Sequence, residues 1–375
     1  MRVIYSVGVR FAGGGIGTTA YHAVRGLHRA GLLQRLLCGS FRPSEIPQER
    51  IRAMGWPSRA LRKLAVYDPT GWLSYDHDVL YDAWAARRLE PAELFHVWNN
   101  FGLRSLKRAK ELGLVTVVER ASCHPLYQAE VLAEEYRRWG LTWRRPHPAL
   151  HRALAELERA DYVLVPSDFA RQTFLERGYP AERLLQVPFG ADTKRFRPPM
   201  ERGQGPFRVL FVGQVGLRKG ILYLLEAWRR LSWTGAELWL AGRVSREIGP
   251  FLARYGDMPG LRWAGHVTDP VTLYQQADLF CFPSLEEGSA LVTYEALACG
   301  LPVITTPNAG SVVRDGVEGF IVPIREVEGL AAALERLRAD EQLRREMGRA
   351  ARARAEEFTW ERYGESLSHY LMRIA

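Results

Sequence analysis

The stretch from Phe282 to Thr306 constrains the fold most, because it predicts a strand, a polar loop, a helix and a second strand in immediate succession. The mainly apolar residues 278–282 form the first strand, and helical spacing follows from Ala290 to Cys299. Gly300 stands where a left-handed helix C-cap is expected, and Pro302 prevents the helix from continuing. A unit of this kind belongs to a parallel sheet, and its loop lies at the carboxyl edge of that sheet.

The loop between this strand and this helix is expected to bind an anion. Backbone N–H groups are free at a helix N-terminus, and the helix dipole favours negative charge there. Two acids flank the position, because Glu287 lies in the loop and Glu295 lies about two helical turns further on, facing the same side. Amides that bind phosphate and carboxylates that accept from sugar hydroxyls suit a ligand containing both groups. The predicted contacts are Glu287, Gly288, Ser289, Ala290, Leu291 and Glu295.

The same stretch follows the pattern P-S-x-x-E-G-x-x-x-x-x-x-E-A-x-A-C-G-x-P-V-I, with its two glutamates eight residues apart. This order resembles the donor-binding motif of the retaining GT-B glycosyltransferases of family 4. The alternative is an ordinary strand–helix turn with two solvated glutamates, which does not account for the further motifs below. The resemblance implies an α/β GT-B fold, in which two doubly wound Rossmann-like domains face a central cleft. Strands and helices alternate in both halves of the sequence, which favours the same architecture.

The length of 375 residues suffices for two domains of ordinary size. Residues 187–199 contain Pro and Gly and few apolar side chains, so they predict a linker that residues 200–206 extend. We therefore predict an N-terminal acceptor-side domain at 1–198 and a C-terminal donor-binding domain at 199–358. The resemblance implies that a final helix, 359–375, packs back on the first domain.

A glycine-rich turn follows the first predicted strand, residues 2–7, and precedes a helix at about 20–29. Glycines at such a turn let the backbone approach a phosphate closely. The turn is not a Rossmann fingerprint, because the acidic residue expected about twenty positions later is missing. It is similar to the loop that faces the cleft in the glycosyltransferase family, which implies donor contacts at Gly14, Gly15 and Gly17. The alternative is a tight turn that needs positive φ.

His124 follows the end of the predicted strand 115–118 and precedes Pro125. Open α/β sheets bind ligands at such strand ends. The family resemblance places a histidine here, close to the transferred sugar, where a neutral imidazole can hydrogen-bond a hydroxyl or the developing charge. The alternative is a loop histidine that caps a helix. Glu119 and Arg120 are further candidates for the lining of the cleft.

Arg218 and Lys219 precede a predicted helix, 222–231, and two cations at a helix start oppose its dipole. A bound diphosphate would explain them. In the family, an Arg directly after a first Gly and a Lys before a second Gly hold the donor diphosphate. Gly213 and Lys219 match that pattern, whereas Gln214 stands in place of the Arg, and we hypothesise that Arg218 supplies the second charge. The resemblance also implies donor contacts at Arg243, His266 and Val267.

Composition restricts the other classes of function. The net charge is +9, which favours anionic partners such as nucleotide phosphates or anionic lipid, and the absence of a nucleic-acid motif argues against nucleic acid. The four cysteines are scattered without a C-x-x-C pair, as expected for buried thiols in a reducing compartment. No apolar run of about 18 residues predicts a membrane span, and no signal-peptide pattern opens the chain. We expect a cytoplasmic protein, and the basic surface leaves a peripheral association with the inner face of the membrane open.

These features together predict a retaining, hexosyl-type glycosyltransferase of the kind used in polysaccharide biosynthesis. It would transfer a sugar from a nucleotide-diphospho-sugar to a hydroxyl of a glycan, a lipid-linked or a small-molecule acceptor. No cofactor or metal is expected, since no cluster of metal ligands is visible in the sequence. The predicted catalytic residues are His124, Lys219 and Glu287.

Two alternatives remain, because a fold does not determine a function. A nucleotide-sugar epimerase of the same fold would release nucleotide without an acceptor. A non-catalytic nucleotide-sugar-binding protein would keep Lys219 and Glu295 but tolerate the loss of His124. The acceptor, the base and sugar of the donor and the oligomeric state have no signature in the sequence.

Overall fold

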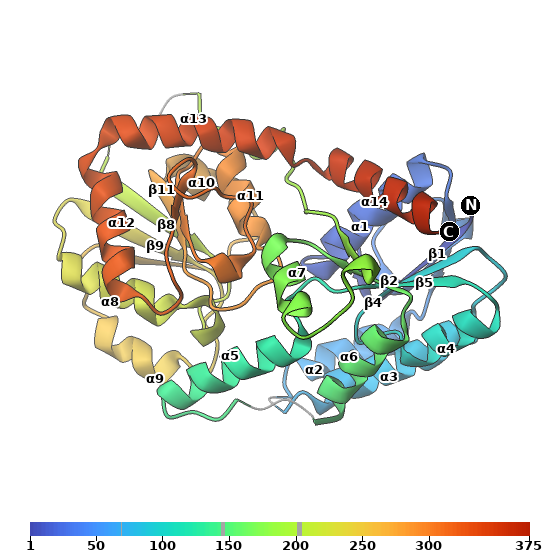
Figure 1. Ribbon diagram of the computed structural model, residues 1–375. Coiled ribbons are helices and arrows are strands. Elements are labelled where there is room, and N and C mark those ends of the chain that lie inside the picture. Colours follow the sequence, from blue (N-terminus) through green and yellow to red (C-terminus); the bar gives the residue numbers. More distant parts are fainter. Residues whose placement is uncertain (69, 144–146, 201–204) are drawn as a thin grey trace.

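The computed structural model describes residues 1–68, 70–143, 147–200 and 205–375, which contain two separate parallel β-sheets flanked by helices (Figure 1). Residues 201–204, in the predicted extension of the linker, lie outside the described part. The first sheet has the order β3-β2-β1-β4-β5-β6-β7, and the second has the order β10-β9-β8-β11-β12-β13. The strand order reverses in the middle of each sheet, as in doubly wound folds, so the predicted fold class is confirmed.

The first sheet lies in the half of the molecule drawn in blue to green in Figure 1. Its strands are β1 (Val3–Phe11), β2 (Leu33–Phe41), β3 (Ile51–Ala53), β4 (Leu94–Trp98), β5 (Val115–Glu119), β6 (Tyr162–Val165) and β7 (Leu184–Gln186). Its helices are α1 (Ile16–Arg29), α2 (Trp56–Ala65), α3 (Trp72–Ala86), α4 (Leu103–Glu111), α5 (Pro125–Arg138), α6 (His147–Arg159) and α7 (Asp168–Leu175). The predicted domain boundary at 198–199 falls after β7 and before the first strand of the second sheet.

The second sheet follows the linker. Its strands are β8 (Phe207–Val212), β9 (Ala236–Ala241), β10 (Leu261–Gly265), β11 (Leu279–Phe282), β12 (Val303–Thr305) and β13 (Gly319–Ile321). Its helices are α8 (Ile221–Leu231), α9 (Gly249–Leu252), α10 (Val271–Gln276), α11 (Leu291–Ala298), α12 (Val327–Ala339) and α13 (Glu341–Glu357). The last helix, α14 (Trp360–Ile374), continues from α13.

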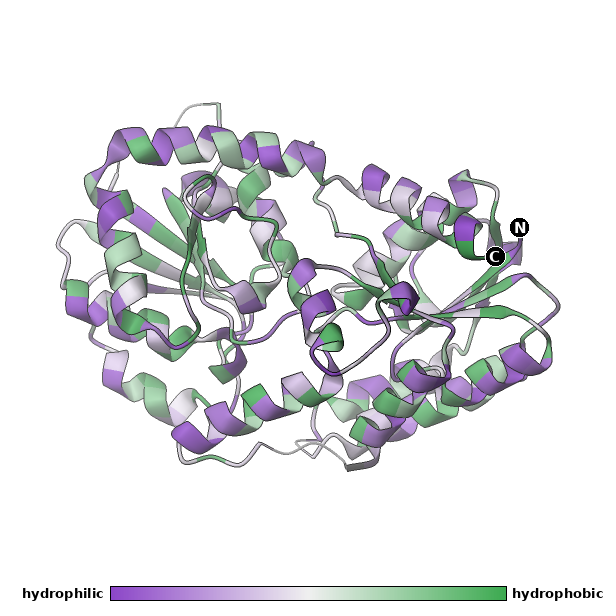
Figure 2. Ribbon diagram, viewed as in Figure 1, coloured by the Kyte–Doolittle hydropathy of each residue, from purple (hydrophilic) through white to green (hydrophobic). Residues whose placement is uncertain are grey.

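The central strands β4 and β11 are buried along their whole length because helices cover both faces of each sheet, whereas the edge strand β10 is mostly exposed. All residues of β4 and β11 are buried, which is the pattern of a parallel sheet packed on both sides. Figure 2 shows this arrangement as mainly hydrophobic strands inside helices that alternate hydrophobic and hydrophilic residues.

Helix α14 returns to the first domain and packs along α1 (Figure 1). The two helices approach closely at a pair of glycines, because a Cβ atom on Gly26 would lie 2.5 Å from Cα of Gly364. Beside this crossing, the rings of His22 and Trp360 stack with their centroids 4.2 Å apart.

Helix α5 of the first domain extends beneath the second domain and fixes the two domains against each other (Figure 1). The buried carboxylate of Glu135 accepts hydrogen bonds from the Tyr223 hydroxyl at 3.0 Å and from Nε of Arg325 at 2.8 Å. Both donors belong to the second domain. The structure therefore holds the two carboxyl-edge surfaces together in a closed arrangement.

Candidate functional site

A cavity of about 280 Å³ lies between the two domains, at the carboxyl ends of strands from both sheets. Ligands of open α/β sheets bind at this edge. The first domain contributes Gly15, Ile16, Thr19, Trp98, Ala121 and Phe189. The second domain contributes Val212, Gly213, Gln214, Lys219, Phe282, Glu287, Ser289, Ala290, Leu291 and Val292. Of the predicted site residues, the cavity brings together Gly15, Gly213, Lys219, Glu287, Ser289, Ala290 and Leu291.

The glycine-rich turn positions the start of α1 against the cavity. Gly15 is the N-cap residue with φ +59°, a conformation that favours glycine. Gly17 leaves no room for a side chain, since a Cβ atom there would lie 2.2 Å from the carbonyl oxygen of Arg10. Gly14 and Gly17 are not among the residues that line the cavity, so the turn acts through the Gly15 backbone and the first turn of the helix.

The N-terminus of α11 faces the cavity from the other domain. Leu291 and Val292 occupy the first helical positions, whose N–H groups have no partner within the helix. The N–H of Ala290 already donates to the carbonyl oxygen of Ala309 at 3.0 Å. The amides of Leu291 and Val292, in the first helical turn, are therefore available to an anion.

Lys219 and Glu287 meet in the cavity as an ion pair between Nζ and Oε1. Lys219 lies in the turn before α8, where its ammonium group is 5.3 Å from the ring centroid of Phe282. Burial and the charge of Arg218 lower the pKa of Lys219. Glu287 supplies the negative charge that balances the ammonium group at this buried position. An anionic ligand can take over this role, since it would restore the same balance.

Glu286 is a buried residue whose role the sequence analysis missed. It belongs to the second domain but accepts hydrogen bonds from three side chains of the first: Ser122, Cys123 Sγ at 3.2 Å and Gln128 Nε2 at 2.9 Å. Burial raises the pKa of this carboxyl, but the charge of Arg218 and these donors outweigh burial and lower the pKa to about 2. Glu286 therefore ties the loop that precedes α11 to the first domain as a charged group.

Arg218 is occupied by the same carboxylates. Its Nε lies 2.8 Å from Oε2 of Glu286, and its Nη2 lies 3.3 Å from Oε2 of Glu287. It does not belong to the described lining of the cavity, whereas Gln214 does. Gln214, which stands in place of the family's arginine, thus faces the cavity, and Arg218 holds the loop before α11 through Glu286 and Glu287.

Gly288, in the loop before α11, also lies against the first domain. A Cβ atom there would lie 2.2 Å from the carbonyl oxygen of Ala121. Ser167 of the first domain donates to the carbonyl oxygen of Gly288 at 2.5 Å. This glycine therefore permits close contact between the domains and is not itself part of the lining.

His124 lies outside the described lining of the cavity. It is the N-cap residue of α5, and its Nδ1 accepts from the N–H of Leu126 at 3.3 Å. Its ring packs edge-on against Phe174, with the centroids 4.9 Å apart. Burial, with the charges of Arg177 and Arg120, lowers its pKa to about 4, so the imidazole is neutral at pH 7. These contacts correspond to the helix-capping alternative of the sequence analysis.

Glu119 lies in a buried hydrogen-bond network behind the cavity wall. The indole N–H of Trp98, which lines the cavity, donates to the Tyr5 hydroxyl at 2.6 Å, and that hydroxyl donates to Glu119 at 3.0 Å. His96 and the Tyr363 hydroxyl of α14 contact the same carboxylate at 2.8 and 3.2 Å. The network links the wall of the cavity to the terminal helix.

The remaining predicted residues surround the cavity at a greater distance. Glu295 is partly buried on α11, accepts from the Tyr274 hydroxyl at 2.9 Å, and has a pKa raised to about 7 by burial. Arg243 is exposed near the end of β9, and His266 is exposed near the end of β10, where Val267 comes next in the chain. The described lining does not include these four residues.

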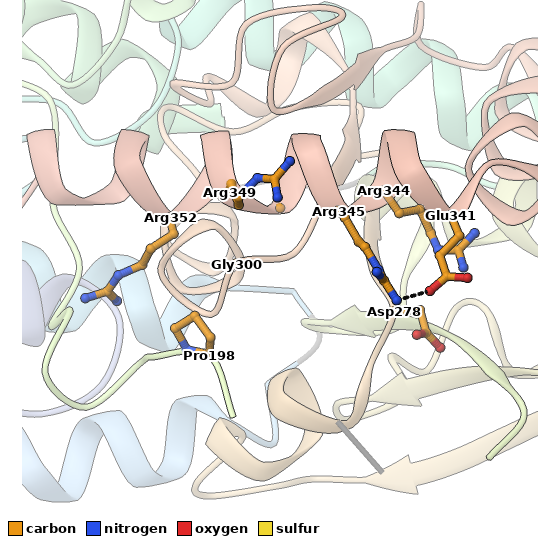
Figure 3. A pocket seen from close by; sticks show the side chains of 9 residues that line it. Pro198, Asp278, Gly300, Glu341, Arg344, Arg345, Arg349 and Arg352 are labelled. Carbon is orange, nitrogen blue, oxygen red and sulfur yellow. Dashed lines mark hydrogen bonds and ion pairs between the residues drawn. The ribbon is translucent and has the colours of Figure 1, made fainter. Parts of the chain in front are cut away.

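A larger hollow of about 640 Å³ lies along α13 (Figure 3). It opens at Gly300, just beyond the C-terminal end of α11, whereas the interdomain cavity lies at the N-terminal end of that helix. Its arginines mostly hold the fold: Arg345 pairs with Glu341, and Arg352 donates to carbonyl oxygens of the linker and of α11. We place the candidate site in the smaller cavity, because that cavity gathers the predicted residues from both domains.

The described residues contain neither a cluster of metal ligands nor a membrane-spanning helix. Within the described ranges, no group of three His, Cys, Asp or Glu side chains is placed to hold a metal ion. The described helices include none that is both long and apolar enough to span a membrane.

Two Rossmann-like domains with a cavity between their carboxyl edges define the GT-B class of fold, and comparison with known proteins identifies the family. Residues 13–195 match the family described as Glycosyltransferase Family 4, and residues 206–340 match Glycosyl transferases group 1. The chain belongs to this family of glycosyltransferases.

Curated relatives agree with this assignment, and solved structures share the fold. D-inositol 3-phosphate glycosyltransferase from Geodermatophilus obscurus is 31% identical over 253 residues, which are 60% of this chain and 55% of that protein. The chain spans about half the length of the curated relatives it matches. Sucrose-phosphate synthase from Thermosynechococcus elongatus has the same fold, with a TM-score of 0.74 and 22% identity over 100% of this chain and 99% of that chain. HepE from Anabaena, solved in complex with UDP, has a TM-score of 0.69 and 17% identity over the whole of both chains.

Proposed function

We propose that this protein transfers a glycosyl group from a nucleotide-diphospho-sugar to a hydroxyl acceptor in the interdomain cavity. The observation that carries the proposal is the convergence of Lys219, Glu287 and the start of α11 on one cavity that the first domain closes. Membership of the glycosyltransferase family supports the reaction class, and the UDP complex of HepE supports a nucleotide donor.

The cavity would bind the donor through its diphosphate. The ammonium group of Lys219 and the N–H groups of Leu291 and Val292 are the donors available to it. Hydrogen bonds to charged groups are worth about 1.5–3 kcal/mol each. When the diphosphate pairs with Lys219, the carboxylate of Glu287 is released and can accept hydrogen bonds from sugar hydroxyls. Before the donor binds, Glu287 thus neutralises the Lys219 ammonium group that the diphosphate later contacts.

The chemical step would retain the anomeric configuration and proceed without a metal. The bond between the anomeric carbon and the diphosphate oxygen breaks, and the charge that develops on the diphosphate is stabilised by Lys219 and the α11 amides. The acceptor hydroxyl attacks from the same face, its oxygen bonds to the anomeric carbon, and its proton passes to the departing phosphate oxygen. Glu295 would hold the ribose hydroxyls, and His124 would orient the loop before α5 that meets the loop before α11.

Replacing Glu287 tests this proposal. We expect Glu287→Ala to lose most of the transfer rate while still binding the nucleoside diphosphate, because Glu287 contacts the sugar and not the phosphates. The exposed Glu335 of the same domain provides a matched control, Glu335→Ala, which should retain wild-type turnover. A panel of labelled donor sugars is supplied with and without acceptor, and the product anomer is determined by NMR.

Three outcomes would contradict parts of the proposal. Wild-type turnover by Glu287→Ala would contradict the assigned role of that residue. An inverted product would contradict retention, and rapid nucleotide release without any acceptor would indicate the epimerase alternative.

A further inference from the structure

The segment that contains α2 and the start of α3 gathers exposed apolar side chains. Trp56 is 74% exposed, Leu64 55%, Val66 70%, Tyr67 69% and Trp72 47%. Elsewhere in the described chain, large exposed apolar residues are scattered along the sequence. We name these five residues the α2 patch. Soluble proteins rarely leave a concentrated group of this kind facing water unless it binds a partner.

The helical positions place part of the patch on one stripe. Trp56, Ala60 and Leu64 are four residues apart, so they follow one another along the same side of α2, and all three are exposed. The opposite side is fixed to the protein, because the buried hydroxyl of Ser58 hydrogen-bonds Nε2 of His77 on α3 at 2.8 Å. The outward direction of the apolar stripe is therefore set by the way α2 packs on α3.

Three exposed cations lie on the same helix: Arg59 and Lys63 flank the stripe, and Arg62 lies nearer the side that faces α3. Arg62 has a long ion pair with Asp78 at 4.0 Å. Among the described residues, the structure gives the side chains of Arg59 and Lys63 no ion pair or hydrogen bond. An exposed helix with Trp and Leu on one side and basic residues next to them is typical of helices that lie in a membrane interface.

Charge favours a lipid surface over a second copy of the chain. In a symmetric dimer the same patch would face itself, and the three cations of each copy would be brought together. Anionic headgroups would neutralise the cations, and Trp and Tyr are the side chains that membrane interfaces favour. We propose that the α2 patch docks this protein on an anionic lipid surface.

The patch lies on the acceptor-side domain and is separate from the donor cavity. Helix α2 follows β3, the edge strand of the first sheet, so it starts at the same carboxyl edge that carries the cavity. None of the patch residues lines that cavity. Docking goes beyond the proposed transfer reaction, and vesicle binding is measured without donor, so a failure of either proposal leaves the other unaffected.

Co-sedimentation of the 375-residue chain with vesicles tests the proposal. We expect binding to phosphatidylcholine vesicles that contain phosphatidylglycerol, weak binding to phosphatidylcholine alone, and a decrease as salt is raised. The triple variant Arg59→Gln, Arg62→Gln, Lys63→Gln should bind on the order of 100-fold more weakly, at about 1 kcal/mol for each cation. The double variant Trp56→Ser, Leu64→Ser should also lose binding, because its apolar side chains no longer enter the interface.

Matched controls separate the patch from general stickiness. Trp263→Ser removes an exposed tryptophan of the second domain, and the double variant Arg345→Gln, Arg349→Gln removes exposed arginines of α13. Both controls should bind vesicles as the wild type does. The proposal is overturned if the wild type does not bind anionic vesicles, or if the patch variants bind equally well. It is also overturned if light scattering detects a dimer that the patch variants dissociate while lipid binding is absent.

Discussion

Glu286→Gln should destabilise the closed arrangement of the two domains, because it removes a buried charge that accepts hydrogen bonds from side chains of both domains. The pKa of Glu286 is about 2, against 4.5 for an unperturbed glutamic acid. Each unit of pKa corresponds to about 1.4 kcal/mol, so the interactions made only by the carboxylate form amount to roughly 3 kcal/mol. Glutamine resembles the protonated form, and we expect the variant to lose about this free energy of unfolding at pH 7.

The pH dependence has a definite sign. The folded-state pKa is depressed, so the stabilising contribution is present above pH 4.5 and is lost as the pH falls towards 2. The difference in the free energy of unfolding between wild type and Glu286→Gln should therefore shrink to roughly half its pH 7 value by pH 3. Urea unfolding at pH 7 and pH 3 measures this difference, with Glu335→Gln as an exposed control. Hydrogen exchange of residues 122–128 reports whether the domains separate at the Glu286 contact. A loss below about 1 kcal/mol at pH 7, or a difference that does not change with pH, would refute the reasoning.

Two further variants test the donor cavity. Gln214→Arg adds a charged donor at a position that lines the cavity, so the dissociation constant of the nucleoside diphosphate should fall by roughly tenfold in calorimetric titrations; no change would show that residue 214 does not face the diphosphate. Glu295 has a pKa raised to about 7, so its charged form increases between pH 6 and pH 8, and nucleotide affinity should rise over that range more in the wild type than in Glu295→Gln. Equal pH profiles would contradict the ribose contact.

The repeating strand–helix pattern was readable from the sequence because each unit depends on local signals. The predicted left-handed C-cap occurs at Gly300, with φ +69°. The predicted helix 290–299 corresponds to α11, Leu291–Ala298. The helix predicted from about residue 20 begins earlier, at Ile16, because Gly15 provides the cap and Gly17 is itself helical. Most of these helices and strands could therefore be predicted from local periodicity and cap residues.

Long-range contacts were not readable in the same way. Glu286 and Glu287 are neighbours in the sequence, but the first is buried against residues 122–128 of the other domain, and only the second lines the cavity. Nothing local distinguishes their environments. Arg218 shows the same difficulty, because its partners are carboxylates that the fold brings close to it.

Residues 40–90 were the least readable segment, and the structure explains why. They form the short edge strand β3 and the helices α2 and α3, whose exposed apolar residues obscure the usual alternation between a buried and a solvated side. A surface that carries tryptophan and leucine cannot be recognised as a surface by hydrophobic patterning alone.

The central claim is that the interdomain cavity binds a nucleotide-diphospho-sugar through Lys219. The most direct measurement is a thermal-shift panel of UDP, GDP, ADP and their sugar conjugates, with EDTA and then with Mg²⁺, on the wild type and on Lys219→Ala. A ligand that binds only the folded state raises Tm by mass action. We predict a clear rise with one nucleotide, of the same size in EDTA, that disappears in Lys219→Ala. No rise with any nucleotide, or an equal rise in the variant, would contradict the donor site described above.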